Sequence, residues 1–538
     1  MPDANSTLFP EEKDIPEKYH INPIVQREYL VNGQIKQWNG PTQKVLSPVC
    51  IREGNNISQK IIGEYPLMNK ETALECLDAA VKAYDGGEGA WPTMSVEGRI
   101  NHVETFLTSM AKSRDEVINL LMWEIGKSYN DSAKEFDRTA DYVRATISEL
   151  KNLDRISSRP VIEEGVFGQI RRTPLGTALC MGPFNYPLNE TFTTLIPAVI
   201  MGNPIVFKPA KYGVLLHKPL LKAYQESFPA GVINIIYGDG KEIITPIMES
   251  GKIDVLAFIG SAKVVRMLEK QHPKPNRLEC IEGLDARNPS IILDDANIET
   301  ALSENVVGAL SFNGQRCTAH KRLFVQRGIA NQFVPQFCER VDNLKWGMPW
   351  TPGVAITPLP EAGKTEYLES LVQDAIAKGA RIANAKGGQA IYTFYSPTVL
   401  TGVKPDMRIS QEEQFGPVVP IIVFDNINEP LEYIRNSESG QQVALFGRDP
   451  KVIGPAIDFI VNSNSRVNLN SQCQRGPDTF PFGGRKDSAK KILSVSDALK
   501  VLSTRSVVGA KYTPENKELI RSIMQARSST FLNTDWIF

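Results

Sequence analysis

Apolar residues recur at helical spacing in the first third of the chain and form short continuous runs after it. Amphipathic patterns predict helices at 72–84, 96–110 and 115–149, and the last is expected to break near Lys127. Short apolar runs then predict strands at 177–181, 205–208, 232–236 and 255–259, separated by helical stretches. This alternation predicts right-handed βαβ crossovers and a parallel sheet covered on both faces. A second α/β set follows Pro289, with strands at 290–293, 322–325 and 418–424 and a helix at 331–344.

Composition limits the classes of protein to consider. The 538 residues are too many for one core, and 42% hydrophobic with 22% charged residues is usual for a globular protein. A net charge of −1 gives no broad basic surface for nucleic acid or anionic membranes, and no apolar run is long enough to span a bilayer. Seven cysteines without CxxC pairs and five dispersed histidines argue against disulfides and a metal site. We therefore expect a cytoplasmic enzyme or binding protein.

The segment Phe-Asn-Gly-Gln-Arg-Cys-Thr at 312–318 is the clearest candidate for chemistry. A thiol is a catalyst only as its thiolate, which a nearby cation or a helix N-terminus favours. Cys317 follows a predicted helix and precedes a predicted strand, so its side chain can face a cleft. The alternative is a small buried hydrophobe, the commonest role of a free cysteine. The segment alone leaves both readings open.

Three further segments follow predicted strands, where ligands collect in open parallel sheets. Asn185, in Gly-Pro-Phe-Asn-Tyr-Pro, carries an amide that can donate to an oxyanion, although asparagine between prolines also suits a turn. Lys208 and Lys211 can bracket a phosphorylated ligand or be ordinary exposed lysines. Gly260 and Ser261 open a predicted helix, whose first N–H groups suit a phosphate.

These motifs occur together in one order: GPFNYP, FKPA, FPAGVINIIYG, FIGS, FNGQRCTAHKRLFV and QEEQFGPV. Over about residues 60 to 510 the chain resembles the aldehyde dehydrogenase family. The segment Gln-Arg-Gly-Pro-Asp-Thr-Phe-Pro-Phe at 474–482 is similar to the branch of non-phosphorylating, NADP-dependent glyceraldehyde-3-phosphate dehydrogenases.

The resemblance implies a covalent mechanism, in which Cys317 attacks the aldehyde carbon. The oxyanion of the thiohemiacetal would be held by the Asn185 amide and the backbone N–H of Cys317. Hydride transfer to NADP would leave a thioester, which water hydrolyses to 3-phosphoglycerate. The cofactor-binding residues that the resemblance implies are Lys208 and Glu413 for its hydroxyls, Phe415 for the nicotinamide end, and Gly260 and Ser261 for the pyrophosphate.

The choice of cofactor and substrate depends on cations. NAD-preferring members of the family commonly have a glutamate at the position of Lys211, where a carboxylate repels a 2′-phosphate and an ammonium attracts one. Lys211 therefore predicts NADP. A phosphorylated aldehyde needs fixed cations near the entrance of the site, and the guanidinium group of arginine matches the geometry of a phosphate. Arg475 is the first candidate, followed by Arg138 and Arg316. Tyr186 could add a hydroxyl. For each arginine, a surface salt bridge is the alternative.

The chain departs from the family at the general base that activates the deacylating water. Aligned on Asn288 and Pro289, the family's glutamate falls on Gly283. Our candidate base is the neighbouring Glu282, with three other carboxylates in range: Glu279, Asp285 and Glu413. Without a base the thioester would form and turn over slowly. Two other functions therefore stay open: an NADP-dependent dehydrogenase for a different aldehyde, and a catalytically impaired, cofactor-binding relative.

The family resemblance also implies the domain plan of an α/β enzyme. A Rossmann-type cofactor domain would comprise 31–156, 176–285 and 481–500, and an α/β catalytic domain 286–480. Strands at 157–175 and 501–510 would form a small β oligomerisation element, whose edges need a partner, so a homodimer or homotetramer is expected. Residues 1–30 would be an extension. The sequence of the tail 511–538 predicts a polar helix followed by the aromatic end Trp-Ile-Phe. This tail is either a helix on the protein's own surface or an arm that packs on a partner subunit.

Overall fold

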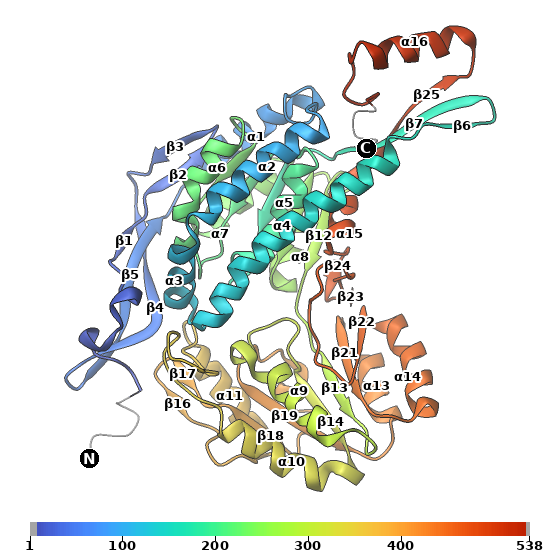
Figure 1. Cartoon of the computed structure of the whole chain (residues 1–538). Helices are drawn as coiled ribbons and strands as arrows, with labels where there is room; N and C mark the ends of the chain where they lie inside the picture. The colour runs from blue at the N-terminus through green and yellow to red at the C-terminus, as the bar shows by residue number, and fades with distance from the viewer. Residues whose placement is uncertain (1–7, 534–538) are drawn as a thin grey trace.

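The computed structural model describes residues 8–533 and contains two α/β lobes and a projecting arm (Figure 1). The sheet of the first lobe has the order β24 (Ala489–Lys490), β12 (Glu279–Gly283), β11 (Val255–Ile259), β8 (Ala178–Met181), β9 (Ile205–Lys208), β10 (Ile233–Ile235), β2 (Glu28–Val31) and β3 (Gln34–Gln37). Its five strands from β12 to β10 are parallel, and four of them are strands that the sequence predicted. Their residues are almost all buried, which explains why each reads as a continuous apolar run.

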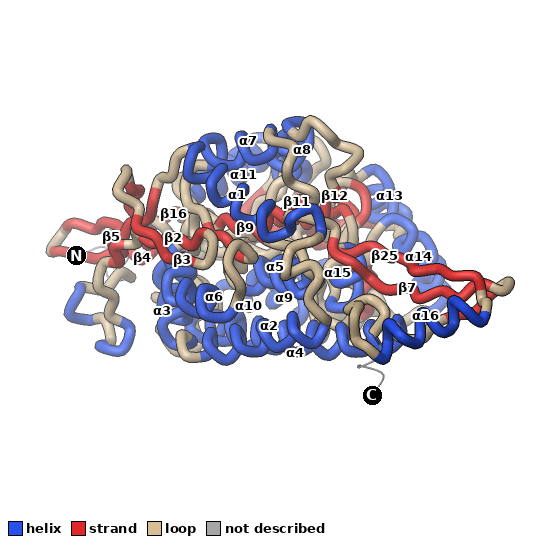
Figure 2. The backbone as a smooth tube through the Cα atoms, turned by 90° about the horizontal axis from the view of Figure 1, so that it is seen from above, coloured by secondary structure: helices blue, strands red, loops and turns tan. Residues whose placement is uncertain are grey.

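Helices cover both faces of this sheet, as Figure 2 shows from above. One layer contains α1 (Lys70–Tyr84), α7 (Gly240–Glu249) and α8 (Ala262–Gln271). The other contains α2 (Val96–Ala111), α3 (Arg114–Ile125), α4 (Tyr129–Ser157), α5 (Asn189–Ile200), α6 (Leu221–Ser227) and α15 (Val495–Val501). The predicted break near Lys127 is confirmed: α3 ends before Gly126, whose φ is 68°, and Ser128 caps α4 by accepting a hydrogen bond from the Asp131 N–H.

The second lobe holds a seven-stranded sheet in the order β15 (Arg381–Ile382), β18 (Thr398–Thr401), β19 (Val418–Phe424), β14 (Arg322–Gln326), β13 (Pro289–Ile292), β21 (Gln442–Phe446) and β22 (Arg466–Leu469). It is parallel except at β15. Its helices are α9 (Ile298–Leu310), α10 (Arg327–Asp342), α11 (Lys364–Ala377), α12 (Arg408–Gln411), α13 (Asn428–Asn436) and α14 (Pro450–Ser463). The prediction of a second α/β set is confirmed, although the helix expected at 331–344 begins four residues earlier.

The arm is a three-stranded antiparallel sheet in the order β25 (Ser503–Lys511), β7 (Val166–Pro174) and β6 (Val161–Glu163). It extends from the end of α4 and carries α16 (Pro514–Gln525) (Figure 1). The helix expected in the tail is therefore present, whereas its aromatic end at 536–538 lies outside the described residues. β6 and β7 fall within the range 157–175 expected for an oligomerisation element, and β25 lies within 501–510 except for its last residue, Lys511.

Smaller sheets complete the fold. β1 (Ile24–Val25), β5 (Asn56–Pro66) and β4 (Thr42–Glu53) form a sheet for which the sequence analysis made no prediction. Two short pairs join β16 (Ala390–Ile391) to β17 (Phe394–Tyr395) and β20 (Ser439–Gly440) to β23 (Arg485–Lys486). Across the described part of the chain, no helix has the length and apolar character needed to cross a membrane.

Candidate active site

A cavity of about 950 Å³ contains most of the predicted site residues. Its lining includes eleven of them: Arg138, Asn185, Tyr186, Lys211, Gly260, Ser261, Arg316, Cys317, Glu413, Phe415 and Arg475. These residues come from both lobes and span more than 300 positions of the sequence. Two predicted residues, Lys208 and Glu282, lie outside this lining.

A strained turn brings Cys317 to the cavity. After α9 the chain passes through three successive left-handed residues, Phe312 (φ 49°), Asn313 (φ 56°) and Gly314 (φ 70°). A Cβ on Gly314 would lie 2.8 Å from two backbone oxygens, so only glycine fits. The Asn313 side chain stabilises the turn because it donates to the Thr357 hydroxyl at 3.1 Å and accepts from the Thr357 N–H at 2.9 Å. Backbone strain of this kind is common at functional sites.

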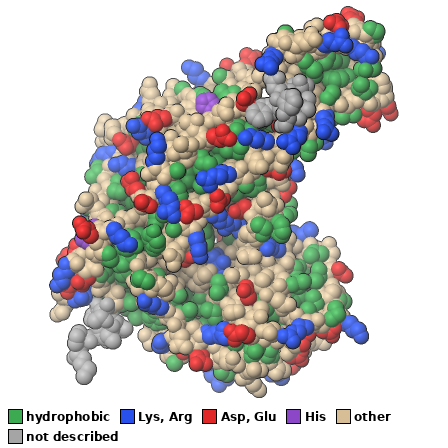
Figure 3. Space-filling model, viewed as in Figure 1, with side chains coloured by type: hydrophobic (Ala, Val, Ile, Leu, Met, Phe, Trp, Pro, Cys, Tyr) green, Lys and Arg blue, Asp and Glu red, His purple; other side chains and the backbone are tan. Residues whose placement is uncertain are grey.

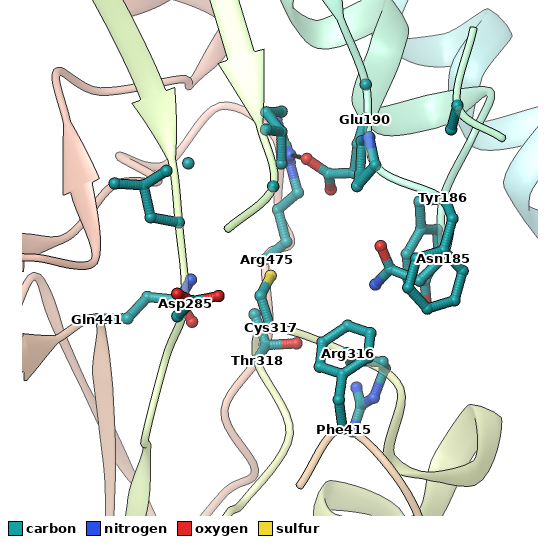
Figure 4. Close-up of a pocket in the computed structure, with 18 of the residues that line it drawn as sticks. Asn185, Tyr186, Glu190, Asp285, Arg316, Cys317, Thr318, Phe415, Gln441 and Arg475 are labelled. Carbon is teal, nitrogen blue, oxygen red and sulfur yellow. Dashed lines mark hydrogen bonds and ion pairs between the residues drawn. The ribbon is translucent and has the colours of Figure 1, made fainter. Parts of the chain in front are cut away.

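Asn185 lies across the cavity from Cys317. Its amide nitrogen donates to the backbone oxygen of Gln315 at 2.8 Å, which joins the two loops that carry the predicted oxyanion donors. Figure 4 shows this amide and the sulfur of Cys317 facing the same open space. Asn288 donates to the backbone oxygen of Cys317 at 2.7 Å and thereby holds the nucleophile's main chain. The arrangement can bind an aldehyde with its oxygen toward an N–H donor.

A fully buried ion pair supports the Asn185 loop. The Lys127 ammonium pairs with Glu135 and donates to the backbone oxygen of Asn185 at 2.7 Å. It also lies 3.5 Å from the ring centroid of Tyr186 and 4.4 Å from that of Phe312. Glu135 in turn accepts the N–H groups of residues 188 and 189 at 3.0 and 3.1 Å. One cation therefore contacts both loops of the site.

The Cys317 thiol is neutral in this environment. Burial raises its pKa to about 11, and the carboxylates of Glu190 and Glu413 act in the same direction. A hydrogen bond with Gln441 and the charge of Arg475 oppose this increase only partly. Formation of the thiolate therefore requires a change in these surroundings, such as the arrival of substrate and cofactor.

We expect alkylation of Cys317 by iodoacetamide to be slow at pH 7 and to accelerate with pH. Since only the thiolate reacts, a pKa raised to about 11 implies a roughly tenfold rate increase per pH unit between pH 7 and pH 10. The measurement is the rate of labelling at Cys317 by peptide mass spectrometry, with Cys317→Ala as the control. A rate that stops rising below pH 8 would contradict the raised pKa.

The three predicted arginines meet at the cavity wall, but two of them are paired with carboxylates. Arg138 binds Asp478 through two hydrogen bonds of 2.7 and 3.0 Å. Arg475 pairs with Glu190 and donates to a backbone oxygen at 3.0 Å. Arg475 is 6% exposed, so its ion pair is buried and not a surface salt bridge. Arg316 donates instead to two carbonyls at the end of α9, at 2.9 and 3.0 Å.

The cofactor side of the cavity contains Lys211 and the start of α8. Lys211 is exposed and, among residues 8–533, pairs with no carboxylate. Asp285 accepts the Ala262 N–H at 3.1 Å and so occupies one of the first N–H groups of α8. Lys208 donates to the backbone oxygen of Pro209 at 3.1 Å, and burial lowers its pKa to about 8.

Glu413 and Phe415 form a further part of the wall. Glu413 lies 3.2 Å from the Lys321 ammonium and accepts the Ala286 N–H at 3.3 Å, while burial raises its pKa. Phe415 packs edge-on against Phe184 with ring centroids 5.8 Å apart. A phenyl ring and a carboxylate thus line the same cavity as Cys317.

The structure corrects the placement expected for Glu282. Alternate residues of a strand face opposite sides of a sheet, and Gly283 is the residue of this pair that lines the cavity. Glu282 points instead toward Glu269 and Cys280, with potential ligand atoms within 4.8 Å of one another, and toward Lys490 at 4.0 Å. Burial raises its pKa to about 7. From this position Glu282 cannot act as a base at Cys317.

Several residues of the site escaped the sequence analysis: Lys127, Glu135, Glu190, Gln441 and Asp478. Glu190 follows the Asn-Tyr-Pro motif by one helical turn, and Asp478 lies three residues after Arg475, so their proximity to predicted residues was a usable signal. The pairing of Lys127 with Glu135 across a helix break had no such signal.

Comparisons with known proteins agree with this geometry. The model of the aldehyde dehydrogenase family matches residues 47–507, and the chain belongs to this family. It is 32% identical over 492 residues to the NADP-dependent glyceraldehyde-3-phosphate dehydrogenase of Streptococcus equinus, covering 89% of this chain and 97% of that protein. A probable succinate-semialdehyde dehydrogenase [NADP(+)] of Sinorhizobium fredii is 26% identical, covering 81% of this chain and 87% of its own length. The crystal structure of the NADP-dependent glyceraldehyde-3-phosphate dehydrogenase of Bacillus halodurans, complexed with NADP, has a TM-score of 0.82 and 28% identity, covering 91% of this chain and all of that one.

Proposed function

We propose that this aldehyde dehydrogenase uses NADP to oxidise glyceraldehyde 3-phosphate to 3-phosphoglycerate without phosphorylation. The observation that carries the proposal is the grouping of Arg138, Arg316 and Arg475 in the cavity that holds Cys317 and Asn185. Guanidinium forks match a phosphate, and the thiol with its opposing amide suits addition to an aldehyde. The Streptococcus and Bacillus relatives are each named an NADP-dependent glyceraldehyde-3-phosphate dehydrogenase.

In the proposed mechanism Cys317 does the covalent chemistry. Its sulfur adds to the aldehyde carbon, and the Asn185 amide with the Cys317 N–H holds the resulting oxyanion. Bound NADP would supply the acceptor for the hydride that leaves this carbon. Cys317 then carries a thioester, from which water releases the acid and restores the thiol. The Lys127 cation keeps the Asn185 loop in place throughout.

The residues present fit an NADP molecule. The cavity extends from Cys317 past Gly260 and Ser261 to Lys211, which is an exposed cation suited to a 2′-phosphate. Glu413 would bind ribose hydroxyls, and Phe415 would lie against the nicotinamide. Lys208 is not among the residues that line the cavity, so its expected contact with the cofactor hydroxyls stays a prediction.

Lys211→Glu should weaken the preference for NADP over NAD. A carboxylate at this position repels the 2′-phosphate that the ammonium attracts, and charged hydrogen bonds of this kind are worth about 1.5–3 kcal/mol. Because Lys211 is exposed, we expect the ratio of kcat/KM for NADP to that for NAD to fall by about tenfold. Steady-state kinetics with both cofactors measure this ratio, with Lys222→Glu, outside the cavity, as the matched control. An unchanged ratio would exclude a role for Lys211.

The substrate is tested by following NADPH absorbance with a panel of aldehydes. We expect the highest kcat/KM with glyceraldehyde 3-phosphate, no requirement for inorganic phosphate or CoA, and 3-phosphoglycerate as the product. Glyceraldehyde, lactaldehyde and succinate semialdehyde are the comparison substrates. A clear preference for one of these would overturn the proposed substrate, and NADP binding without turnover of any aldehyde would overturn the proposed function.

Arg316→Leu should weaken binding of the phosphorylated substrate specifically. Arg316 is held by backbone carbonyls and not by a carboxylate, so its removal leaves no buried anion unpaired. Loss of a charge-assisted contact should raise KM for glyceraldehyde 3-phosphate by about tenfold. The KM for unphosphorylated glyceraldehyde serves as the internal control. If both values rise equally, Arg316 does not contact the phosphate.

The pairing of two arginines favours one alternative substrate class. Glu190 and Asp478 compensate Arg475 and Arg138, so a dianionic phosphate must compete with two carboxylates. An NADP-dependent dehydrogenase for a less charged aldehyde is therefore the second candidate function. The same substrate panel separates the two candidates.

We also propose a cytoplasmic homodimer or homotetramer. All seven cysteines are free, which suits a reducing compartment. The arm exposes apolar residues on its two edge strands, including Val161 (50%), Ile162 (53%) and Val507 (63%), and Figure 3 shows such residues among charged ones there. Exposed strand edges of this kind pair with other chains. Light scattering of the purified protein measures the subunit number.

A further inference from the structure

The position of Gly283 leaves the proposed reaction without its expected base. A general base contributes about 10²–10⁴-fold to such a step, and Glu282 faces away from the thiol. The replacement must be a carboxylate that shares the cavity with Cys317. The carboxylates that line this cavity are Asp131, Glu190, Asp285, Glu361 and Glu413.

Three of these carboxylates are occupied by other contacts. Asp131 accepts the Ser128 hydroxyl at 2.9 Å at the start of α4. Glu361 pairs with Lys364 at 3.0 Å. Both oxygens of Glu413 are engaged, one beside the Lys321 ammonium at 3.2 Å and the other with a backbone N–H at 3.3 Å. In each case the donor favours the charged form of the carboxylate and so opposes its protonation.

Asp285 also lines the cavity but is committed to the cofactor side. One of its oxygens accepts the first N–H group of α8, where the proposed cofactor's pyrophosphate would lie. The charged groups that most affect the pKa of the Cys317 thiol are Glu190, Glu413 and Arg475, and Asp285 is not one of them.

Glu190 combines burial, proximity and a free oxygen. It lies in the first turn of α5, and its N–H donates to the backbone oxygen of Tyr186 at 3.1 Å, which ties it to the Asn185 loop. One carboxylate oxygen pairs with Arg475, which compensates the buried charge. Within residues 8–533 the other oxygen, Oε1, has no hydrogen-bond partner. Figure 4 shows its carboxylate beside Arg475, bordering the same space as Cys317.

We propose that Glu190 is the general base that activates the deacylating water, an inference that rests on the proposed aldehyde oxidation. The water oxygen adds to the thioester carbon while one of its protons passes to Oε1 of Glu190. The carbon–sulfur bond then breaks with its electron pair on Cys317, and Glu190 returns the proton to the sulfur. Thioester and water give carboxylic acid and thiol, with no change of oxidation state.

Glu190→Gln tests the proposal because it keeps the shape and removes the basic oxygen. In a rapid-mixing experiment with NADP and glyceraldehyde 3-phosphate, the variant should form about one NADPH per subunit in a burst. The steady-state rate should then fall by about 10²-fold or more, in the range of a lost general base. The burst distinguishes loss of deacylation from loss of folding or of acylation.

Gly283→Glu supplies the matched gain of function. The three atoms nearest to a Cβ at Gly283 all belong to Ile259, the closest at 3.4 Å, and the backbone there is not left-handed, so a side chain can start from this position. Added to Glu190→Gln, it should raise the steady-state rate at least tenfold above that of Glu190→Gln alone. Added to the wild-type protein, it should accelerate the steady state by less than about threefold, because a base is already present. This measurement on Gly283→Glu alone does not depend on whether the Glu190→Gln variant folds.

Several outcomes would overturn the inference. Equal steady-state rates in wild type and Glu190→Gln would exclude Glu190 as the base, and a lost burst would place it in acylation instead. A change confined to the KM for the phosphorylated substrate would make it a binding residue. A large acceleration of the wild type by Gly283→Glu would show that no base is present. If the wild-type protein itself formed no NADPH from any aldehyde, the proposed function would fail first.

Discussion

Cys317→Ala is expected to abolish aldehyde oxidation, with kcat reduced by at least about 10⁴-fold. Without the sulfur there is no thiohemiacetal, so the aldehyde hydrogen is never placed on a tetrahedral carbon from which it can leave as hydride. Asn185 and the surrounding N–H donors remain, but they stabilise an intermediate that no longer forms. NADPH formation over hours, measured against the wild type, gives the residual rate.

The same substitution should leave the fold and cofactor binding intact. Cys317 is partly exposed to the cavity, so its truncation to alanine creates little unfilled volume, and the melting temperature should change by only a few degrees. Cys338→Ala on α10, away from the cavity, is the matched control and should retain full activity. Residual activity of more than a few per cent in Cys317→Ala would contradict its assignment as the nucleophile.

Lys127→Met is expected to produce the largest loss of stability, about 3–5 kcal/mol in the free energy of unfolding. Both Lys127 and Glu135 are fully buried, so removal of the cation leaves an uncompensated carboxylate in the interior. The Asn185 loop also loses its 2.7 Å contact with the ammonium, so kcat should fall more than KM rises. Urea unfolding and steady-state kinetics measure the two effects.

A double substitution separates the ion pair from its positioning role. Lys127→Met with Glu135→Gln removes both charges and should recover part of the lost stability, whereas kcat should stay low because the Asn185 backbone still lacks its donor. Lys36→Met removes the partner of Glu75 in an exposed pair and should cost less than about 1 kcal/mol. If Lys127→Met costs no more than this control, the buried pair does not stabilise the site.

The sequence predicted the parts of the fold that local patterns encode. The central parallel strands are buried on both faces, so their sequences are continuous apolar runs, and the break predicted near Lys127 separates α3 from α4. By contrast, β4 and β5 bury only parts of their length and carry no clear alternation, so their sheet went unpredicted. Local pattern therefore predicted elements where burial is uniform and missed them where it is not.

The sequence by itself predicted which residue types meet in the active site: Cys317, Asn185, a cofactor-side lysine and three arginines. Most of them stand in motifs that resemble those of the aldehyde dehydrogenase family. Only the tertiary structure decided how they are paired and which way they point. Glu190 and Arg475 are separated by 285 positions and Arg138 and Asp478 by 340, and no local pattern encodes such contacts. The choice between Glu282 and Gly283 depended on which face of β12 meets the cavity, because a one-residue step along a strand reverses the direction of a side chain.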